Sequence, residues 1–523
     1  MTITTHPLRH LGAITLFLSL LLWSACGDTF RPVVIPIPPT PPDPRSAHIA
    51  FAITNNGNFN PGSIMLIDVS GDSTSGFGNV GIGPSHATLV PPSGSHIAVA
   101  NQGDDTITLI STSAFGGGLT APTTVTLSPQ FNPVYVTSNE NNVLYAASLG
   151  NTASAISPSV AVISTLSNAV TNVISLPAIA ANSLITLVET PDARKVYVAT
   201  QLGTATGAVT SINTVDKSAA PILDPTGILS VPIAAAARSD SARVYVLNQG
   251  NGNVAVIDSS TSPTADTLLP GTVSVGAGAD FLLYDPRLNR LYVTNSGLAT
   301  LTIFDATVDP PNLLATLSLP SGANPSCSIG CASVAASADG TRAYVTTLRQ
   351  GGSNVAVQVT AINTTNNTIL GTINLPGTTA LANCVGARFR VSSAAAADSS
   401  RVFVAECDAG AIATIRTADN SLISLPAPVS AAEPVRVNIT GASQTGSETT
   451  FNYSLVSGPG LQVGMSIVIT LSGTPNIQQS FIVGSVGSGT FTVLNPPGES
   501  SGAFSATGLA TPLQNPVFVL PGP

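Results

Sequence analysis

Charged residues are scarce in this sequence. Asp, Glu, Lys and Arg make up 8% of the 523 residues, against roughly 25% in ordinary soluble domains. The 17 basic residues are outnumbered by 26 acidic ones, so the formal net charge is −9. A chain with so few cations has no basic patch that could neutralise nucleic-acid phosphates. We therefore expect no nucleic-acid partner.

Long apolar segments are missing after the N-terminus, although 43% of the residues are hydrophobic. No uninterrupted apolar run there reaches the roughly 18 residues that a membrane-spanning helix needs. Aromatic residues are only 5% of the chain, whereas 46 Gly and 40 Pro interrupt it throughout. This composition predicts short strands joined by tight turns. Because it is uniform along the chain, one large repetitive domain is favoured over several ordinary ones.

The N-terminus has the features of an export signal. Arg9 precedes an apolar segment, residues 11–23, which ends in small residues just before Cys26. The segment is too short for a transmembrane helix. Its end, LLWSAC, resembles the bacterial lipobox, with Trp23 where leucine is usual. The resemblance implies that residues 1–25 are a lipoprotein signal peptide and that Cys26 is acylated. The alternative is an ordinary secretory signal.

Prolines dominate the segment that follows, RPVVIPIPPTPPDPRS. Such a run favours an extended polyproline II conformation and excludes helix. Residues 26–46 are thus predicted to be a lipid anchor and a semi-rigid linker. We expect an exported, monomeric protein of the cell envelope, held by its N-terminal lipid at the outer membrane or on a periplasmic membrane face.

Four further cysteines, an even number, are expected to form disulfides in an exported chain. Cys384 and Cys407 flank a predicted hairpin almost symmetrically and should lie opposite each other. Cys327 and Cys331 are close enough to close one loop. A metal or redox site is the alternative, but no histidine follows His96 and the CxxxC spacing is unusual for zinc. We therefore predict no metal and no cofactor.

A short strand followed by a polar residue and glycine recurs along the chain, and YVTNSG from Tyr292 is its best copy. Eight such strands are spaced 46 to 59 residues apart, with anchor residues Ala52, Ala98, Tyr145, Tyr197, Tyr245, Tyr292, Tyr344 and Phe403. Each period contains four apolar runs separated by turn residues. This order predicts four-stranded antiparallel blades that repeat around a ring, because closure removes exposed sheet edges.

The motif YVTN at residues 292–295, followed by TLTIFD, resembles the YVTN-type β-propeller family. Weaker copies cover roughly residues 48 to 430. The resemblance implies an all-β propeller over residues 47–430. It says little about activity, because similar blades occur in surface-layer proteins, in proteins of unknown role and, more distantly, in propeller lactonases. Function must therefore be argued from a site.

The chain ends suggest how the ring closes. The first blade begins at its second strand, and the C-terminal QNPVFVLPGP echoes FNPVYVTSNE, an innermost strand. Residues 512–523 are therefore predicted to complete the first blade. The count favours eight blades, with seven as the alternative. Between the last blade and this strand, residues 433–510 alternate apolar and polar residues. They predict a small inserted β-sandwich or barrel, either a structural cap or an adhesive, carbohydrate-binding module.

No catalytic motif is present, so candidate site residues come from topology. His86, Asn182, Asp280 and Arg388 open innermost strands at the channel mouth, and Glu406 is a further candidate. We favour a non-catalytic binding or scaffold protein that holds a protein or polysaccharide. The alternative is a hydrolase, lactonase-like in the first instance, or an oxidoreductase at the channel mouth. Clustering of the candidates around one pocket would favour the enzyme, and a channel lined by Ala, Ser and Val would favour binding.

Overall fold

The computed structural model describes most of residues 49–522, which belong to one compact unit, Pro44–Pro523. Outside the described residues lie 1–48, 56–60, 69–72, 92–93, 95, 112–121, 128–130, 152–153, 178–183, 261–265, 325–328, 352–353, 376–383, 385–387, 424–435, 446–447, 458–459, 462, 464–465, 473–477, 495–502, 505–506, 513–514 and 523. The predicted signal peptide, lipidation site Cys26 and linker are therefore outside the description. Where the chain is described, no helix is long and apolar enough to cross a membrane.

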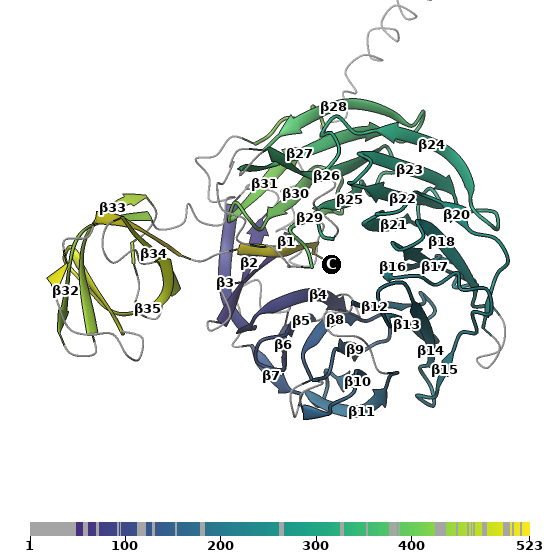
Figure 1. Cartoon of the computed structure of the whole chain (residues 1–523), viewed down its shortest axis with the longest axis horizontal. Coiled ribbons are helices and arrows are strands. Elements are labelled where there is room, and N and C mark those ends of the chain that lie inside the picture. Colours follow the sequence, from purple (N-terminus) through teal and green to yellow (C-terminus); the bar gives the residue numbers. More distant parts are fainter. Residues whose placement is uncertain are drawn as a thin grey trace, which may run out of the picture. The chain divides into compact units, whose positions relative to one another are not determined.

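Eight antiparallel sheets surround a central axis as the blades of a propeller (Figure 1). Blade 1 consists of β39 (Asn515–Pro521), β1 (Ile49–Asn55), β2 (Pro61–Asp68) and β3 (Ser73–Ile82), and blade 2 of β4 (Pro84–Val90), β5 (His96–Asn101), β6 (Thr106–Ser111) and β7 (Thr123–Thr126). Blade 3 consists of β8 (Pro133–Thr137), β9 (Val143–Ser148), β10 (Ser159–Ser164) and β11 (Ala169–Ser175), and blade 4 of β12 (Ile185–Glu189), β13 (Lys195–Gln201), β14 (Gly207–Asn213) and β15 (Ala219–Pro221).

Blades 5 to 8 continue the ring. Blade 5 consists of β16 (Pro232–Ala237), β17 (Arg243–Asn248), β18 (Asn253–Asp258), β19 (Thr267–Leu268) and β20 (Val273–Ser274), and blade 6 of β21 (Phe281–Asp285), β22 (Arg290–Asn295), β23 (Thr300–Asp305) and β24 (Asn312–Ser318). Blade 7 consists of β25 (Ala332–Ala336), β26 (Arg342–Gly351), β27 (Asn354–Asn363) and β28 (Thr368–Asn374), and blade 8 of β29 (Val391–Ala395), β30 (Arg401–Glu406) and β31 (Ala411–Arg416). The eight sheets confirm the all-β propeller and the blade count that the repeats predict.

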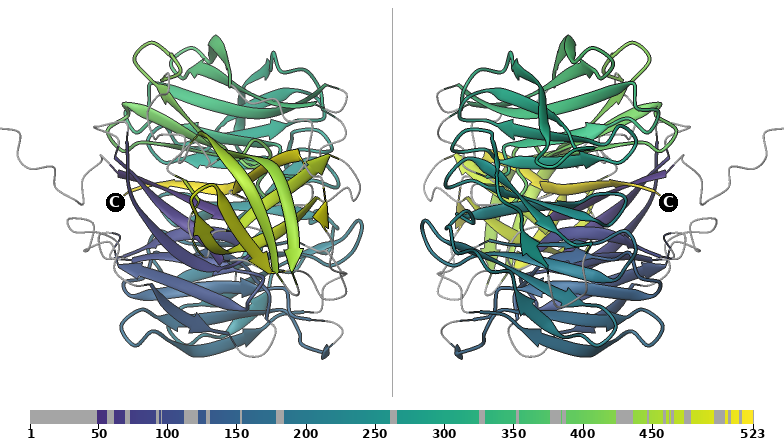
Figure 2. Two further views of the ribbon diagram at one scale, coloured as in Figure 1. Left: turned by 90° about the vertical axis from the view of Figure 1, so that its left-hand side faces the viewer. Right: turned by 90° about the vertical axis from the view of Figure 1, so that its right-hand side faces the viewer.

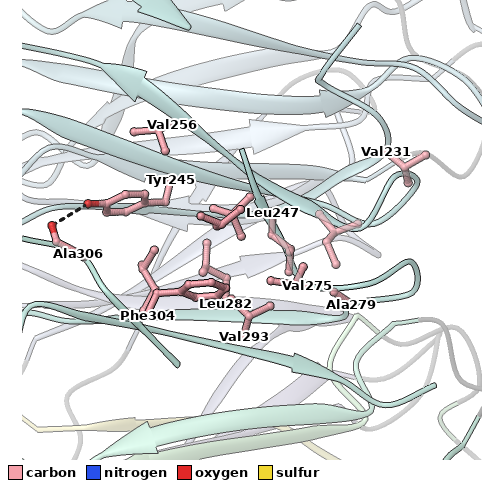
Figure 3. Close-up of a cluster of buried hydrophobic side chains, with 14 residues drawn as sticks. Val231, Tyr245, Leu247, Val256, Val275, Ala279, Leu282, Val293, Phe304 and Ala306 are labelled. Atoms are coloured by element: carbon pink, nitrogen blue, oxygen red, sulfur yellow. Dashed lines mark hydrogen bonds between the residues drawn. The ribbon is translucent and has the colours of Figure 1, made fainter. Parts of the chain in front are cut away.

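The second strand of each blade is the most deeply buried, because it packs between the faces of neighbouring sheets. In β22, every residue after Arg290 is buried. The repeat places an aromatic ring in most of these strands, and five tyrosines are fully buried: Tyr145, Tyr197, Tyr245, Tyr292 and Tyr344. Figure 3 shows one of the resulting cores, in which Tyr245 packs near Val256 and Phe304 between blades 5 and 6.

Several of these tyrosines also bind the next blade through their hydroxyl groups. Tyr245 donates to the carbonyl of Ala306 at 3.3 Å (Figure 3). Tyr344 donates to the side chain of Asn420 at 2.9 Å. A tyrosine buries an apolar ring and still needs a partner for its hydroxyl group. The repeat thus supplies both the core of each blade and a polar contact to its neighbour.

The C-terminal strand closes the ring. β39 pairs with β1, with Val519 opposite Ala52, and in Figures 1 and 2 it lies among the purple strands of blade 1. The eight innermost strands contact one another in turn, from β39 through β4 and onward to β29 and back to β39. Ala52 and Val519 share a core with Phe403 of blade 8. Strands from the two ends of the sequence therefore build one blade.

A ninth sheet is formed by the chain between blade 8 and β39. Its order is β33-β36-β35-β34-β38-β32-β37, and β32 also pairs with β33, which closes the sheet into a barrel. Its strands are β32 (Arg436–Thr445), β33 (Glu448–Ser457), β34 (Ser466–Ser472), β35 (Gln478–Gly487), β36 (Thr490–Leu494), β37 (Ala503–Phe504) and β38 (Thr507–Pro512). It has its own apolar core, in which Phe451 and Phe491 stack at 5.1 Å.

Candidate functional site at the channel mouth

A proline followed by a β-bulge marks the start of the innermost strand in four blades. The register skips one residue after the proline, at Ser85, Val134, Ile233 and Val517. Proline is tolerated in a strand at its first residue or at a bulge. A bulge also redirects the side chains that follow it. The residue after each bulge, His86, Tyr135, Ala234 or Phe518, lines one cavity at the centre of the ring.

All eight blades contribute to this cavity, whose volume is about 160 Å³. Three of the sequence candidates, His86, Asp280 and Arg388, line it together. Asn182 lies outside the described residues. Glu406 is buried at the end of β30 and does not line the cavity. We call this space the channel-mouth cavity.

Aromatic rings gather on one side of the channel-mouth cavity. The imidazole of His86 stacks on Tyr135 with a centroid separation of 3.7 Å. Phe518 lies 4.6 Å from His86 and 5.3 Å from Phe389. Sequence analysis missed these three aromatic residues as site residues. The similarity between the sequences NPVYV and NPVFV could have identified two of them, because it places Tyr135 and Phe518 at equivalent positions after the bulge.

Arg388 crosses the channel. It precedes blade 8, yet its Nη1 donates to the carbonyl of Ile185 in blade 4 at 2.7 Å. Its Nη2 lies 3.5 Å from the carbonyl of Ile233 in blade 5. Ile233 is the residue that the pairing register with β17 skips. The guanidinium carbon also lies 4.7 Å from the centre of the Tyr135 ring, within cation–π range.

His86 is held as a neutral imidazole. Burial, together with the positive charge of Arg388, keeps the pKa of His86 well below its usual value. Its Nδ1 accepts a long hydrogen bond, 3.5 Å, from the backbone N–H of Val136. In a neutral ring the accepting nitrogen carries no proton, so the proton is on Nε2. His86 therefore presents a hydrogen-bond donor through its other nitrogen.

Asp280 is buried at the start of blade 6, and both of its carboxyl oxygens are occupied. Oδ1 accepts a hydrogen bond from Thr294 at 2.7 Å, and Oδ2 accepts one from Ser296. Burial raises the pKa of Asp280, whereas these two hydroxyl donors lower it. The raised pKa means that burial outweighs the hydrogen bonds. Asp280 is thus held by β22 and the residue that follows it.

A disulfide and an ion pair fix the chain on either side of Arg388. Cys384 and Cys407 are bonded, with Cα atoms 6.1 Å apart, which is the pairing that the hairpin symmetry predicts. Arg390 forms a buried ion pair with Asp408 at 2.7 Å. Asp408 also accepts a hydrogen bond from the backbone N–H of Cys384 at 2.9 Å. These bonds hold the segment that presents Arg388.

The remaining cysteine pair is described only in part. Cys331 is disulfide-bonded, whereas Cys327 lies outside the described residues. Among the residues that the structure describes, no group of three or more His, Cys, Asp or Glu side chains is arranged to hold a metal ion.

Comparison with known proteins adds information about the fold. No family model matches the chain, and no curated protein matches it. Among solved structures, it is similar to the dihydro-heme d1 dehydrogenase NirN, with a TM-score of 0.50 and 12% identity over 72% of this chain and 73% of that chain. The β-propeller domain of Cps50 (Swd1) from Myceliophteria thermophila gives a TM-score of 0.43 and 11% identity over 64% and 97%.

The periplasmic gluconolactonase PpgL of Pseudomonas aeruginosa is also similar, with a TM-score of 0.44 and 17% identity over 62% of this chain and 94% of that chain. Of these three, the likeness to NirN, with a TM-score of 0.50, supports the fold alone, and none of them carries an activity across. The chain therefore has a β-propeller fold, whereas its likeness to the YVTN repeat family rests on its sequence motif.

Proposed function

We propose that this protein is a non-catalytic binding protein of the cell envelope, and that the channel-mouth cavity holds its ligand. The observation that carries the proposal is the state of the three polar side chains in the cavity. Arg388 and His86 present donors, and both oxygens of Asp280 are occupied by Thr294 and Ser296. These groups are arranged to recognise a ligand by hydrogen bonds and charge.

A hydrolytic site needs a base that can reach the proton of its nucleophile. With its proton on Nε2, His86 is a donor. Among the described residues, its one direct hydrogen bond is the contact with Val136 N–H. Asp280 is held by two hydroxyl groups that donate to it, so each of its oxygens already accepts one hydrogen bond. This geometry supports binding over proton abstraction.

The size of the cavity limits what it can hold. A volume of about 160 Å³ is below the roughly 300 to 1,000 Å³ of pockets that enclose drug-sized ligands. The cavity suits a small molecule, or one terminal group of a polysaccharide or protein partner. The export signal and the Cys384–Cys407 disulfide support a location outside the reducing cytoplasm. On this proposal, the lipid on Cys26 holds the propeller at the membrane.

Ligand-dependent thermal stability tests the proposal. The purified protein is heated with a panel of small metabolites and oligosaccharides, because a ligand that binds only the folded state stabilises it by about 2.7 kcal/mol at one hundred times its Kd. Ala234→Phe fills the cavity, and Leu166→Phe, at a side chain that is 78% exposed, is the matched control. A true ligand raises the Tm of the wild type and the control but not of Ala234→Phe. Equal stabilisation of all three proteins would show that the ligand binds outside the channel-mouth cavity.

A lactonase-like hydrolase is the second candidate, because His86, Asp280 and Arg388 do line one cavity. In that case, Arg388 would stabilise negative charge on the substrate, and Asp280, with its raised pKa, would exchange a proton. Hydrolysis of five- and six-membered lactones, followed by acid release at constant pH, tests this reading. Turnover that disappears in Asp280→Asn would support the enzyme. Rates equal to the uncatalysed reaction would leave binding as the function.

A further inference from the structure

The charge of Arg388 has no counter-ion in the described part of the chain. Its side chain is half-buried with the Nε atom withdrawn from water, burial lowers its pKa, and no carboxylate of the described residues lies within ion-pair distance of it. The neighbouring Arg390 differs, because Asp408 neutralises it at 2.7 Å. A buried cation is expensive unless it is paired. The cavity therefore contains a positive charge that an anion would compensate.

Arg388 also has free hydrogen-bonding capacity. A guanidinium carries five N–H donors, and two of them are directed at the carbonyls of Ile185 and Ile233. The Nε donor has no acceptor within the described residues. A fork of this shape matches the two oxygens of a carboxylate. The Nε2–H of His86, in the same cavity, is a further donor for an oxygen atom.

The surroundings of Arg388 select among anions. The rings of Tyr135 and Phe389 lie 4.7 and 5.6 Å from its guanidinium carbon, which favours a ligand with an apolar or flat part. The cavity volume of about 160 Å³ corresponds to roughly five water molecules at about 30 Å³ each. Asp280 lines the same cavity, and its two oxygens already accept hydrogen bonds from Thr294 and Ser296, so it adds no positive charge for the further oxygens of a phosphate. These features together describe a small monoanion.

We propose that the channel-mouth cavity binds a small organic carboxylate, whose two oxygens pair with Arg388 and whose apolar part lies against the aromatic side of the cavity. The inference rests on the proposed function, because it names the class of ligand for that site. The carboxylate can belong to a free acid or to the terminal uronic acid of a polysaccharide. Both present the same group to Arg388, and the experiment distinguishes them.

Titration calorimetry on the purified full chain compares acids with their neutral counterparts. Acetate and benzoate are measured against acetamide and benzamide, galacturonate against galactose, and inorganic phosphate separately. We expect at least one acid to bind tenfold or more tightly than its neutral counterpart. Benzoate binding indicates a free acid, whereas galacturonate binding indicates a uronic acid. Phosphate should bind more weakly than that acid.

Variants place the binding at Arg388. Arg388→Gln should weaken acid binding at least tenfold, and Arg388→Lys, which keeps the charge but loses the fork, should weaken it less. Arg194→Gln removes an arginine whose side chain is 81% exposed and should change nothing. If Arg388→Gln does not fold, the affinity of Arg388→Lys and the comparison of acids with amides still test whether Arg388 binds the carboxylate.

Equal affinity for acids and their neutral counterparts, or tighter binding of phosphate, would overturn the carboxylate assignment. A ligand of another class that stabilises the wild type but not Ala234→Phe, with no acid bound, would also overturn it while leaving the proposed function standing. If neither the acids nor the wider panel bind in the cavity, both proposals fail.

Discussion

Glu406→Gln removes a buried carboxyl group that gives the propeller a pH-dependent stability. Glu406 ends β30 opposite Val391 and is only 2% exposed. Its Oε2 has no hydrogen-bond partner among the described residues. At the corresponding ends of β5 and β22, Asn101 and Asn295 are buried neutral side chains with hydrogen bonds. Burial raises the pKa of Glu406 from 4.5 to about 8, so the folded protein holds the proton at neutral pH.

The direction in which stability changes with pH follows from the pKa of Glu406 in the folded and in the unfolded protein. The folded state binds the proton more tightly than the unfolded state, so stability is greatest below pH 4.5 and falls as the pH rises through 8. Each pKa unit corresponds to about 1.36 kcal/mol, so a difference of about 3.5 amounts to about 5 kcal/mol. This is a large fraction of the roughly 5–15 kcal/mol that stabilises a typical domain. Glutamine has nearly the same shape and does not titrate.

Urea denaturation of the wild type and Glu406→Gln between pH 4.5 and 9 measures this difference. The free energies of unfolding should be similar at pH 4.5, and the variant should become more stable by up to about 5 kcal/mol at pH 9. Glu448→Gln, at an exposed position of β33, is the matched control and should follow the wild type. A difference between wild type and Glu406→Gln that does not change with pH would refute the reasoning.

Three further predictions concern the covalent and topological closure of the molecule. Replacing Cys384 and Cys407 by serine opens a link with a sequence separation of 23 and should lower the unfolding free energy by about 3 kcal/mol, as urea denaturation would show. A chain ending at Pro512 keeps β38 but loses β39, and it should melt lower and aggregate more than one in which residues 433–512 are replaced by a Gly/Ser linker. Labelled palmitate should enter the wild type and not Cys26→Ser.

Each of these predictions has an outcome that would contradict it. Peptide mapping of unreduced protein that finds two free thiols would remove the disulfide. A truncated chain that melts like the full chain, together with collapse of the internal deletion, would show that closure does not depend on β39. Equal labelling of wild type and Cys26→Ser would remove the lipid anchor.

Much of the architecture follows from the sequence by itself, because it depends on local repetition. A period of about 50 residues with four apolar runs specifies a four-stranded blade, and eight copies specify the ring. The echo between FNPVYV and QNPVFV identified the innermost strands, including the one at the C-terminus. His86, Asp280 and Arg388 were found for the same reason. Each lies near or just before the start of an innermost strand, and such positions converge on the axis of any propeller.

Only the tertiary structure decided what these residues do once they meet. Arg388 contacts carbonyls that lie 203 and 155 residues away in the sequence, and these contacts depend on how the ring closes. The stacking of His86 on Tyr135 depends on bulges in two different blades. Burial of Glu406, whose Oε2 has no hydrogen-bond partner in the described part of the chain, depends on its neighbours in space. A repeat specifies each blade through neighbours in the sequence, whereas a central site forms from side chains of separate blades. Its charges and contacts therefore depend on closure of the whole ring.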